Sequence, residues 1–473
     1  MHPLTPTNVL LQLQRPDTMT QHTPNAKLIR SAGAPFFVMI ALFIVLCVAG
    51  GASKANTLGQ GFVRAASLLA VAGLLLARVR FDIREVRAPF LIVIVASVLV
   101  ALQIVPIPFH MWTKLPGREL ISNVTAAVGL SGILRPIAIV PDGALNALLS
   151  LSVPFAVLVC MSASPATREP RFLPIMIAIV CVSAICGLIQ LSGGIIDNPF
   201  INDTRGQAAG LFANRNHQAL FLAVGVPLAL AWGYAPSQRP GWRGWTALGI
   251  VLLLSLMIIG TGSRAGLGLL AVGLVGGGLI IWPTIAGMSR RAPRWVLPAG
   301  IFLVLTILIV LLVVSVDFGR AEAIDRLLDE EVGADMRSRA FPTLISMIMQ
   351  YFPVGSGLGS FDSVFRMVEP LNVLKPTYFN HAHNDYIELL IEGGLPFAAL
   401  LAGALAWFFV ASWRAWRSNV TGRTHIARTG SVVILLVVLA SISDYPARTP
   451  MIMAMLAVSA TWLYSSRASA ENT

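Results

Sequence analysis

Long apolar runs separated by short polar segments follow one another along most of the 473-residue chain. An apolar helix needs roughly 20 residues to cross the ~30 Å hydrocarbon layer of a bilayer. Twelve runs approach that length, and they begin near residues 35, 61, 88, 144, 172, 217, 244, 264, 295, 386, 429 and 450. A spanning segment must satisfy its backbone hydrogen bonds internally, and the period-2 alternation of a membrane barrel is missing. The pattern therefore predicts an all-α, polytopic integral membrane protein with about twelve transmembrane helices.

The arginines between these runs are concentrated in alternate loops. With the N-terminus in the cytoplasm, the short inner loops hold 4, 2, 2, 3 and 4 arginines, at 78–87, 167–171, 237–243, 289–294 and 413–428. The short outer loops hold one basic residue each, at 51–60, 260–264 and 441–450. Cytoplasmic loops of membrane proteins carry the excess of Lys and Arg. We therefore expect both termini in the cytoplasm and three longer segments outside, at 107–143, 193–216 and 317–385.

This topology predicts five parts of the chain: a cytoplasmic tail (1–34), helices one to nine (35–316), a large periplasmic loop (317–385), helices ten to twelve (386–466) and a second cytoplasmic tail (467–473). Apolar residues recur at helical spacing through 341–352. That spacing predicts that the large loop contains amphipathic helices lying on the membrane face.

Composition agrees with a membrane protein, since 56% of the residues are hydrophobic and only 12% are charged. A soluble domain carries about 25% charged residues. The net charge of +12 is explained by the arginine-rich inner loops, so the lipid bilayer rather than nucleic acid is the expected partner. The four cysteines stand in apolar runs without paired ligand spacing, which indicates neither a zinc site nor a disulfide framework.

Polar residues cluster where three of the predicted helices begin on the outer side, in 202–221, 260–270 and 380–389. Helix N-termini carry unpaired N–H groups and about half a positive charge, and therefore attract anions. Each cluster also contains Arg or His, namely Arg205, Arg215, Arg264, His381 and His383. If the three ends converge, they form an anion site on the outer face.

Several of these residues also have a structural interpretation. Arg264 could anchor a helix end at the membrane interface, and Asn214, Asn216 and His217 could cap a helix. Asp385 and Glu388 have the spacing of a capping box, which we favour over a catalytic role. His383 precedes that cap and can accept a proton near neutral pH, whereas the role of His381 stays open.

Two further motifs are weak. Two histidines without a clear carboxylate partner are poor support for a metal site, and neither a metal nor another cofactor is expected. The glycine-rich stretch 352–361 lacks the lysine of a phosphate-binding loop, so it indicates a turn at the end of an amphipathic helix.

Four motifs occur in the order seen in bacterial O-antigen ligases: "GLFANRNHQA", "GTGSRAG", "FPVGSGLGSF" and "HAHNDYIELLIEGGLP". The chain resembles this superfamily, which also includes O-antigen polymerases and protein O-oligosaccharyltransferases, over roughly residues 200–400. The most specific element is His383–Asn384 followed after nine residues by Gly394. Phe397 stands where the family has Gly, Thr or Tyr.

The resemblance implies a GT-C-like glycosyltransferase of the bacterial inner membrane with a periplasmic active site. It would move a glycan from a polyprenyl-diphosphate carrier to a hydroxyl of another glycan, of lipid A core or of a protein, with inversion. Arg205 and Arg264 match family arginines and would bind the diphosphate, and His383 matches the family histidine and would act as the general base. Secondary candidates are Arg215, Asn216, His217, Arg337, Arg339, His381 and Asn384. A polymerase, a protein O-oligosaccharyltransferase, and a transporter or flippase of lipid-linked glycans remain alternatives.

Overall fold

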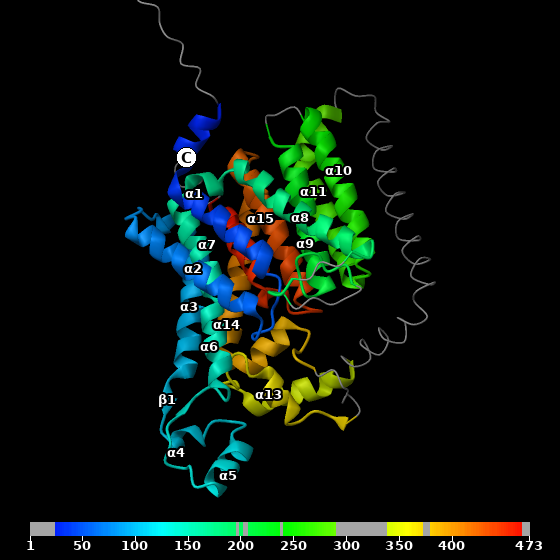
Figure 1. Ribbon diagram of the computed structural model, residues 1–473. Coiled ribbons are helices and arrows are strands. Elements are labelled where there is room, and N and C mark those ends of the chain that lie inside the picture. Colours follow the sequence, from blue (N-terminus) through cyan, green and yellow to red (C-terminus); the bar gives the residue numbers. More distant parts are fainter. Residues whose placement is uncertain are drawn as a thin grey trace, which may run out of the picture.

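The computed structural model describes residues 24–194, 198–201, 207–236, 240–289, 338–371 and 379–465. A bundle of long helices dominates this part of the chain (Figure 1). Its helices are α1 (Pro24–Ala49), α2 (Leu58–Leu76), α3 (Arg87–Ile104), α6 (Pro141–Ser150), α7 (Ser152–Ala163), α8 (Leu173–Leu191), α9 (Arg215–Gly233), α10 (Gly241–Gly260), α11 (Arg264–Ser289), α14 (Asp385–Arg417), α15 (Gly422–Ala440) and α16 (Pro450–Tyr464). Short 3-10 turns are η1 (Ile83–Val86), η2 (Pro165–Arg168), η3 (Pro170–Phe172) and η5 (Pro446–Arg448).

The predicted apolar runs that fall within the described residues correspond to these helices. Among the described residues, eight helical segments are long and apolar enough to cross a membrane, and Gly33–Ala49 and Pro450–Tyr464 form shorter apolar helices. The run near 144 consists of α6 and α7, which meet at Leu151. The run near 295 lies outside the described residues. The all-α polytopic class is confirmed, and the number of twelve spans remains a prediction.

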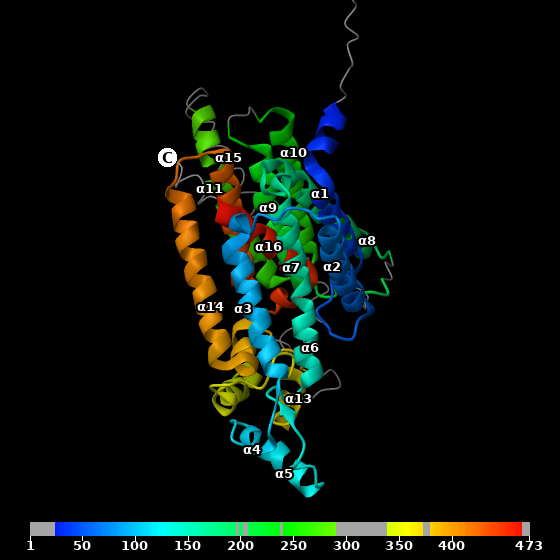
Figure 2. The same cartoon turned by 90° about the vertical axis from the view of Figure 1, so that its left-hand side faces the viewer.

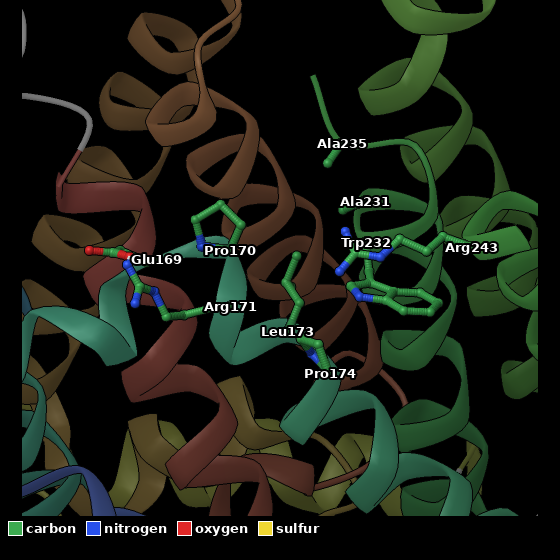
Figure 3. Close-up of a pocket in the computed structure, with 9 residues that line it drawn as sticks. All are labelled: Glu169, Pro170, Arg171, Leu173, Pro174, Ala231, Trp232, Ala235 and Arg243. Atoms are coloured by element: carbon green, nitrogen blue, oxygen red, sulfur yellow. Dashed lines mark ion pairs between the residues drawn. The ribbon is translucent and has the colours of Figure 1, made fainter. Parts of the chain in front are cut away.

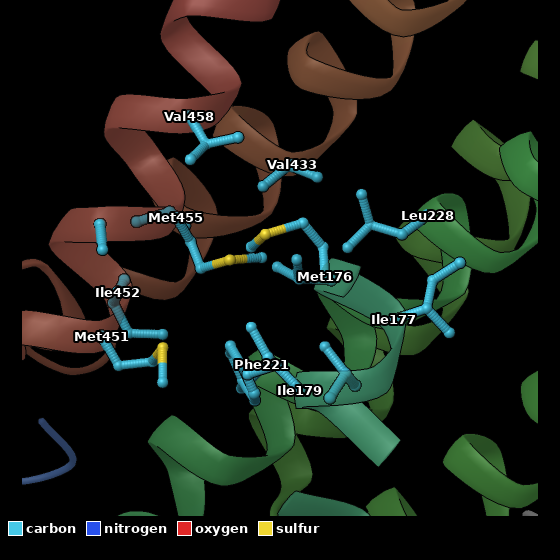
Figure 4. Close-up of a cluster of buried hydrophobic side chains, with 14 of the residues drawn as sticks. Met176, Ile177, Ile179, Phe221, Leu228, Val433, Met451, Ile452, Met455 and Val458 are labelled. Atoms are coloured by element: carbon cyan, nitrogen blue, oxygen red, sulfur yellow. The ribbon is translucent and has the colours of Figure 1, made fainter. Parts of the chain in front are cut away.

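Helix α9 occupies the middle of the bundle and is buried along nearly its whole length. It contacts α8, α10, α11 and α15. Figure 4 shows part of the core around it, where Phe221 and Leu228 of α9 lie among side chains of α8, α15 and α16. A Cβ on Gly225 would come within 2.6 Å of side-chain atoms of Val180 and Leu254. The glycine therefore permits close helix approach, as small residues do in membrane bundles.

An outer lobe extends from one end of the bundle (Figures 1 and 2). It contains α4 (Phe109–Trp112), α5 (Glu119–Ala127), a helix over 338–351, α13 (Phe361–Arg366), and two short antiparallel strands, β1 (Pro106–Ile107) and β2 (Arg135–Pro136). In the strand pair Pro106 lies opposite Pro136, and Ile107 lies opposite Arg135. The sequence did not predict these strands. Parts of the predicted outer segments 107–143 and 317–385 thus lie at the same end of the bundle.

Arg118 links the part of this lobe that precedes α6 to the part that precedes α14. Its buried guanidinium donates hydrogen bonds to the carbonyl oxygens of Pro116 (2.8 Å), Ile137 (2.8 Å) and Gly355 (3.0 Å). It also lies near the rings of Trp112 and Tyr351. Burial lowers the pKa of Arg118 to about 10, partly offset by Tyr351 and Glu119.

The helix over 338–351 has the amphipathic pattern that the sequence predicts. Its buried residues Ala340, Leu344, Met347 and Tyr351 form a core with α13. Its other side exposes large apolar side chains, Phe341, Ile345 and Met349. This second apolar stripe fits a helix that lies on a membrane surface, which remains a prediction.

The glycine-rich stretch 352–361 forms the turn expected after this helix. It meets α14 at Gly394, which has a φ of 57° and interrupts the helical geometry. The N–H of Leu395 donates to the carbonyl oxygen of Pro353 (2.8 Å), and a Cβ on Gly394 would collide with that same oxygen. Glycine is the residue that adopts this conformation without strain. The turn therefore fixes the outer end of α14.

Candidate functional site

The polar starts of α9 and α14 converge on the loop 441–449 between α15 and α16, and the start of α11 joins them through Asn216. Asn216, at the start of α9, accepts a hydrogen bond from Ser263 Oγ just before α11 (2.8 Å) and donates one to Asp444 Oδ2 (3.0 Å). His383, just before α14, places Nδ1 at 3.2 Å from Asp444 Oδ1. Segments far apart in the sequence therefore meet at one carboxylate.

Asp444 is almost fully buried and has several hydrogen-bond donors. Besides Asn216, it accepts hydrogen bonds from Asn214 Nδ2 (3.0 Å) and from the N–H of Tyr445 (3.1 Å). Burial alone would raise the pKa of Asp444. The hydrogen bond with His383 and the charges of His217 and His383 outweigh burial and hold that pKa well below its usual range. Asp444 is consequently a carboxylate, able only to accept hydrogen bonds.

His383 is held against this carboxylate in an unusual backbone conformation. Its φ is 50°, a left-handed value that non-glycine residues adopt at a cost of about 1–3 kcal/mol. The next residue, Asn384, is the N-cap of α14, and Asp385 N–H donates to the carbonyl oxygen of Ser441 (3.0 Å). Because Asp444 only accepts, the His383 Nδ1 carries the hydrogen of this contact. The side chain is 21% exposed, so a substrate can approach it.

Tyr445 contacts the three histidines of the site. Its ring centroid lies 4.1 Å from that of His381 and 5.2 Å from those of His383 and His217. Its hydroxyl shares hydrogen bonds with Asn380 and Asn214. Burial, helped by the negative charges nearby, raises the pKa of Tyr445 above its usual range. The neutral phenol therefore packs against the imidazole rings of all three histidines.

Arg448 forms ion pairs with three carboxylates in the first turns of α14. Its guanidinium reaches Glu388 (3.0 Å), Glu392 (3.0 Å) and Asp385 (3.5 Å). Burial alone would lower the pKa of Arg448, but these three acids raise it above its usual value. Glu388 also meets His381 Nδ1 at 2.8 Å. His381 and His383 thus face different carboxylates.

The predicted capping box of Asp385 and Glu388 is wrong. Asn384 caps the helix instead, because its side-chain oxygen accepts from the N–H groups of Tyr386 and Ile387, both at 3.0 Å. Asp385 and Glu388 bind Arg448, which the capping rule does not consider. At α9 the expected cap is present, since Asn214 accepts from the N–H of Asn216 (2.8 Å) while it also donates to Asp444.

Arg264 and Arg215 stand at adjacent helix starts. Arg264 is the first residue of α11 and is exposed. Arg215 is the first residue of α9, and its Nη1 lies 3.5 Å from where a Cβ on Gly262 would be. Arg339 is exposed in the outer lobe, on the helix over 338–351. Arg205 and Arg337 lie outside the described residues.

Two cavities bear on this site, and the larger of them lies away from its chemistry. It measures about 270 Å³ and is found at the far end of α9, beside Trp232 (Figure 3). The smaller one measures about 150 Å³ and is lined by Asn214, His217 and Tyr445. In the described part of the chain, no three His, Cys, Asp or Glu residues are grouped so that they could hold a metal ion.

These features define a class of protein, a bundle of apolar helices fit to span a membrane, with a His–Asp pair at one end. Residues 248–402, roughly a third of the chain, match the family model described as O-antigen ligase. The match confirms the resemblance to the O-antigen ligase superfamily, which suggests a membrane glycosyl-transferring enzyme. It includes Arg264 and His383 and ends before Asp444. No curated protein matches the chain.

Sequence reasoning missed Asp444, Tyr445 and Arg448. All three lie in "SISDYPARTP", a short loop between two apolar runs. Two charges in so short a loop could have indicated a buried charged site. The loop has little room to extend into water, so its charges need partners at the end of the bundle.

Removing the Arg448 cation should destabilise the fold strongly. Arg448→Met would leave two fully buried glutamates without their cation, and breaking a buried pair in this way costs about 3–5 kcal/mol. Arg366→Met is the matched control, since it breaks an exposed pair with Asp362 (2.7 Å) that is worth about 0–1 kcal/mol. Thermal unfolding of the purified variants measures both, and equal shifts would contradict the role given to Arg448.

Proposed function

We propose that this protein transfers a glycan from a polyprenyl-diphosphate carrier to an acceptor hydroxyl on the periplasmic side of the bacterial inner membrane. The observation that carries the proposal is the His383–Asp444 pair at the point where α9, α11 and α14 begin. The O-antigen ligase family match supports the same class of chemistry. The GT-C-like architecture and the periplasmic orientation belong to this proposal.

In the proposed reaction His383 is the general base. Its Nε2 takes the proton of the acceptor hydroxyl while the oxygen attacks the anomeric carbon of the donor glycan. The bond from that carbon to the diphosphate oxygen breaks, and the lipid diphosphate leaves with the electron pair. Asp444 orients the imidazole through Nδ1 and stabilises the imidazolium that forms. Attack from the side opposite the leaving group inverts the anomeric configuration.

The leaving diphosphate needs positive charge. Arg264 and Arg215 stand at neighbouring helix N-termini, where backbone N–H groups add to the attraction for an anion. Arg205 is proposed as a third contact from the sequence alone. Guanidinium groups form strong, often bidentate hydrogen bonds with phosphate. In this proposal they supply the charge that a metal supplies elsewhere, so transfer should persist in a chelator.

The contacts of the secondary site residues indicate a different role for each. Asn216 and His217 support Asp444, Asn384 caps α14, and His381 is held by Glu388. Arg339, and Arg337 from the sequence alone, are proposed to help select the acceptor. These are positioning roles rather than catalytic ones.

Polymerases and protein O-oligosaccharyltransferases would use the same donor and centre and differ in the acceptor, so the ligase-like reaction rests on the family match. A transporter or flippase would need polar groups through the middle of several helices. The described cluster lies instead where helices begin, at one end of the bundle, which favours an enzyme.

Replacing His383 by Ala tests the proposed base. Since a positioned base contributes roughly 10²–10⁴-fold, glycan transfer from a lipid-linked donor should fall by at least about 10²-fold. His110→Ala, an exposed histidine of the outer lobe, should transfer at the wild-type rate. Unchanged transfer by a folded His383→Ala protein would show that another group accepts the proton.

Replacing Arg264 by Lys tests diphosphate recognition. Lysine keeps the charge but loses the planar fork, so transfer should fall by roughly 10–100-fold if the contact is bidentate. Arg366→Lys, in the exposed ion pair with Asp362, is the control. A rate equal to that of the control would mean that Arg264 only anchors α11 at the membrane interface.

A further inference from the structure

The smaller cavity, of about 150 Å³, adjoins the His383–Asp444 pair but contains neither residue. It lies between the loop 51–57 and the start of α9. Its polar lining residues are Ser53, Lys54, Thr57, Asn214, His217, Asn380 and Tyr445. The reaction proposed above uses none of the residues of the loop.

The backbone of this loop is fixed to the rest of the site. Gly51 accepts a hydrogen bond from the N–H of Ala213 (3.1 Å), and Gly50 accepts one from the N–H of Met451 (3.0 Å). A Cβ on Gly51 would collide with the carbonyl oxygen of Leu211. The wall of the cavity is therefore preformed, as the walls of ligand sites usually are.

His217, which lines this cavity, has one ring nitrogen without a hydrogen-bond partner. The side chain is 1% exposed, and its Nδ1 meets Thr449 Oγ1 at 3.1 Å. Its Nε2 is buried without a hydrogen-bond partner, with Asp444 Oδ2 at 3.9 Å. An unsatisfied buried polar group costs about 1–3 kcal/mol, so a hydrogen bond to this nitrogen would stabilise a polar ligand that reaches it.

The size and the lining of the cavity indicate what kind of ligand it can bind. Its volume is below the ~300–1,000 Å³ of pockets for drug-sized ligands, so it accepts one small unit. Two asparagine amides, a phenol and two hydroxyls offer both donors and acceptors. That mixture suits the hydroxyl groups of a sugar ring. The exposed Lys54 adds a cation that favours a sugar with an acidic substituent.

The loop that lines the cavity and the helix that begins at Arg264 lie on different sides of α9. Helices α1 and α2, which the loop 51–57 connects, lie on one side of α9, and α11 with Arg264 lies on the other (Figures 1 and 2). We propose that this cavity is a subsite for one sugar ring of the substrate, beside the reacting centre. The inference rests on the proposed glycan transfer, and the ring can come from the donor or from the acceptor.

Sugar binding can be measured without activity. Saturation-transfer NMR on the full-length detergent-purified protein would use glucose, galactose, N-acetylglucosamine and glucuronate as probes. At least one should receive saturation from the wild type. Ala213→Phe should fill the cavity and weaken this binding by roughly tenfold or more, equivalent to about 1.4 kcal/mol.

Lys54→Ala is the second variant, because its exposed side chain is not needed for folding, and it should weaken the binding of glucuronate most. Lys114→Ala, an exposed lysine of the outer lobe, is the matched control and should bind as the wild type does. The subsite is refuted if no probe binds the wild type, or if folded Ala213→Phe binds as well as Lys114→Ala does. In either case the cavity holds water only.

Donor turnover then identifies the source of the ring. If Ala213→Phe loses transfer but still hydrolyses the lipid-linked donor, with water in place of the acceptor hydroxyl, the ring belongs to the acceptor. Loss of both reactions assigns it to the donor. The wild type could transfer no glycan and still bind a sugar that Ala213→Phe does not bind. That result would keep the subsite and reject the proposed function. Normal transfer by Ala213→Phe would reject the subsite alone.

Discussion

The buried carboxylate of Asp444 is the group on which the arrangement of the site depends. A carboxylate removed from water is costly unless its oxygens are satisfied. Here the donors come from both sides, Asn214 and Asn216 at the start of α9 and His383 just before α14. Satisfying one charge therefore requires two helix starts and the loop 441–449 to meet. The same requirement holds His383 in a left-handed conformation that its backbone alone would avoid.

A second charge cluster fixes the same loop from its other end. Arg448 pairs with the acids on the first turns of α14, four residues after Asp444 in the chain. Between Asp444 and Arg448 in the chain lies Tyr445, whose ring contacts both His383 and His381. Each histidine is thereby assigned to its own carboxylate, His383 to Asp444 and His381 to Glu388. The loop can hold a reactive group without moving because both of its ends are anchored.

The sequence predicted what depends on local patterns. Apolar runs located the helices, since spanning length and backbone satisfaction leave few alternatives. The polar starts of α9, α11 and α14 were found because they interrupt those runs. The pairing of His383 with Asp444 joins residues 61 positions apart, and no local pattern encodes which partner a long fold will bring near.

The capping box failed for a related reason. Asn is as good an N-cap as Asp, so Asn384 could take that position once Arg448 bound Asp385 and Glu388. Spacing rules consider only neighbours in the chain, whereas these acids respond to a cation 60 to 63 residues away. Buried charges were the part of this site that only the assembled bundle could reveal.

The central claim is that His383 and Asp444 act as one unit, and a double-mutant cycle tests it most directly. Initial rates of glycan transfer would be compared for wild type, His383→Ala, Asp444→Asn and the double variant. Residues that act together lose activity non-additively. The account predicts that the double variant is no slower than His383→Ala. If the two losses multiply, the residues act independently and the account is wrong.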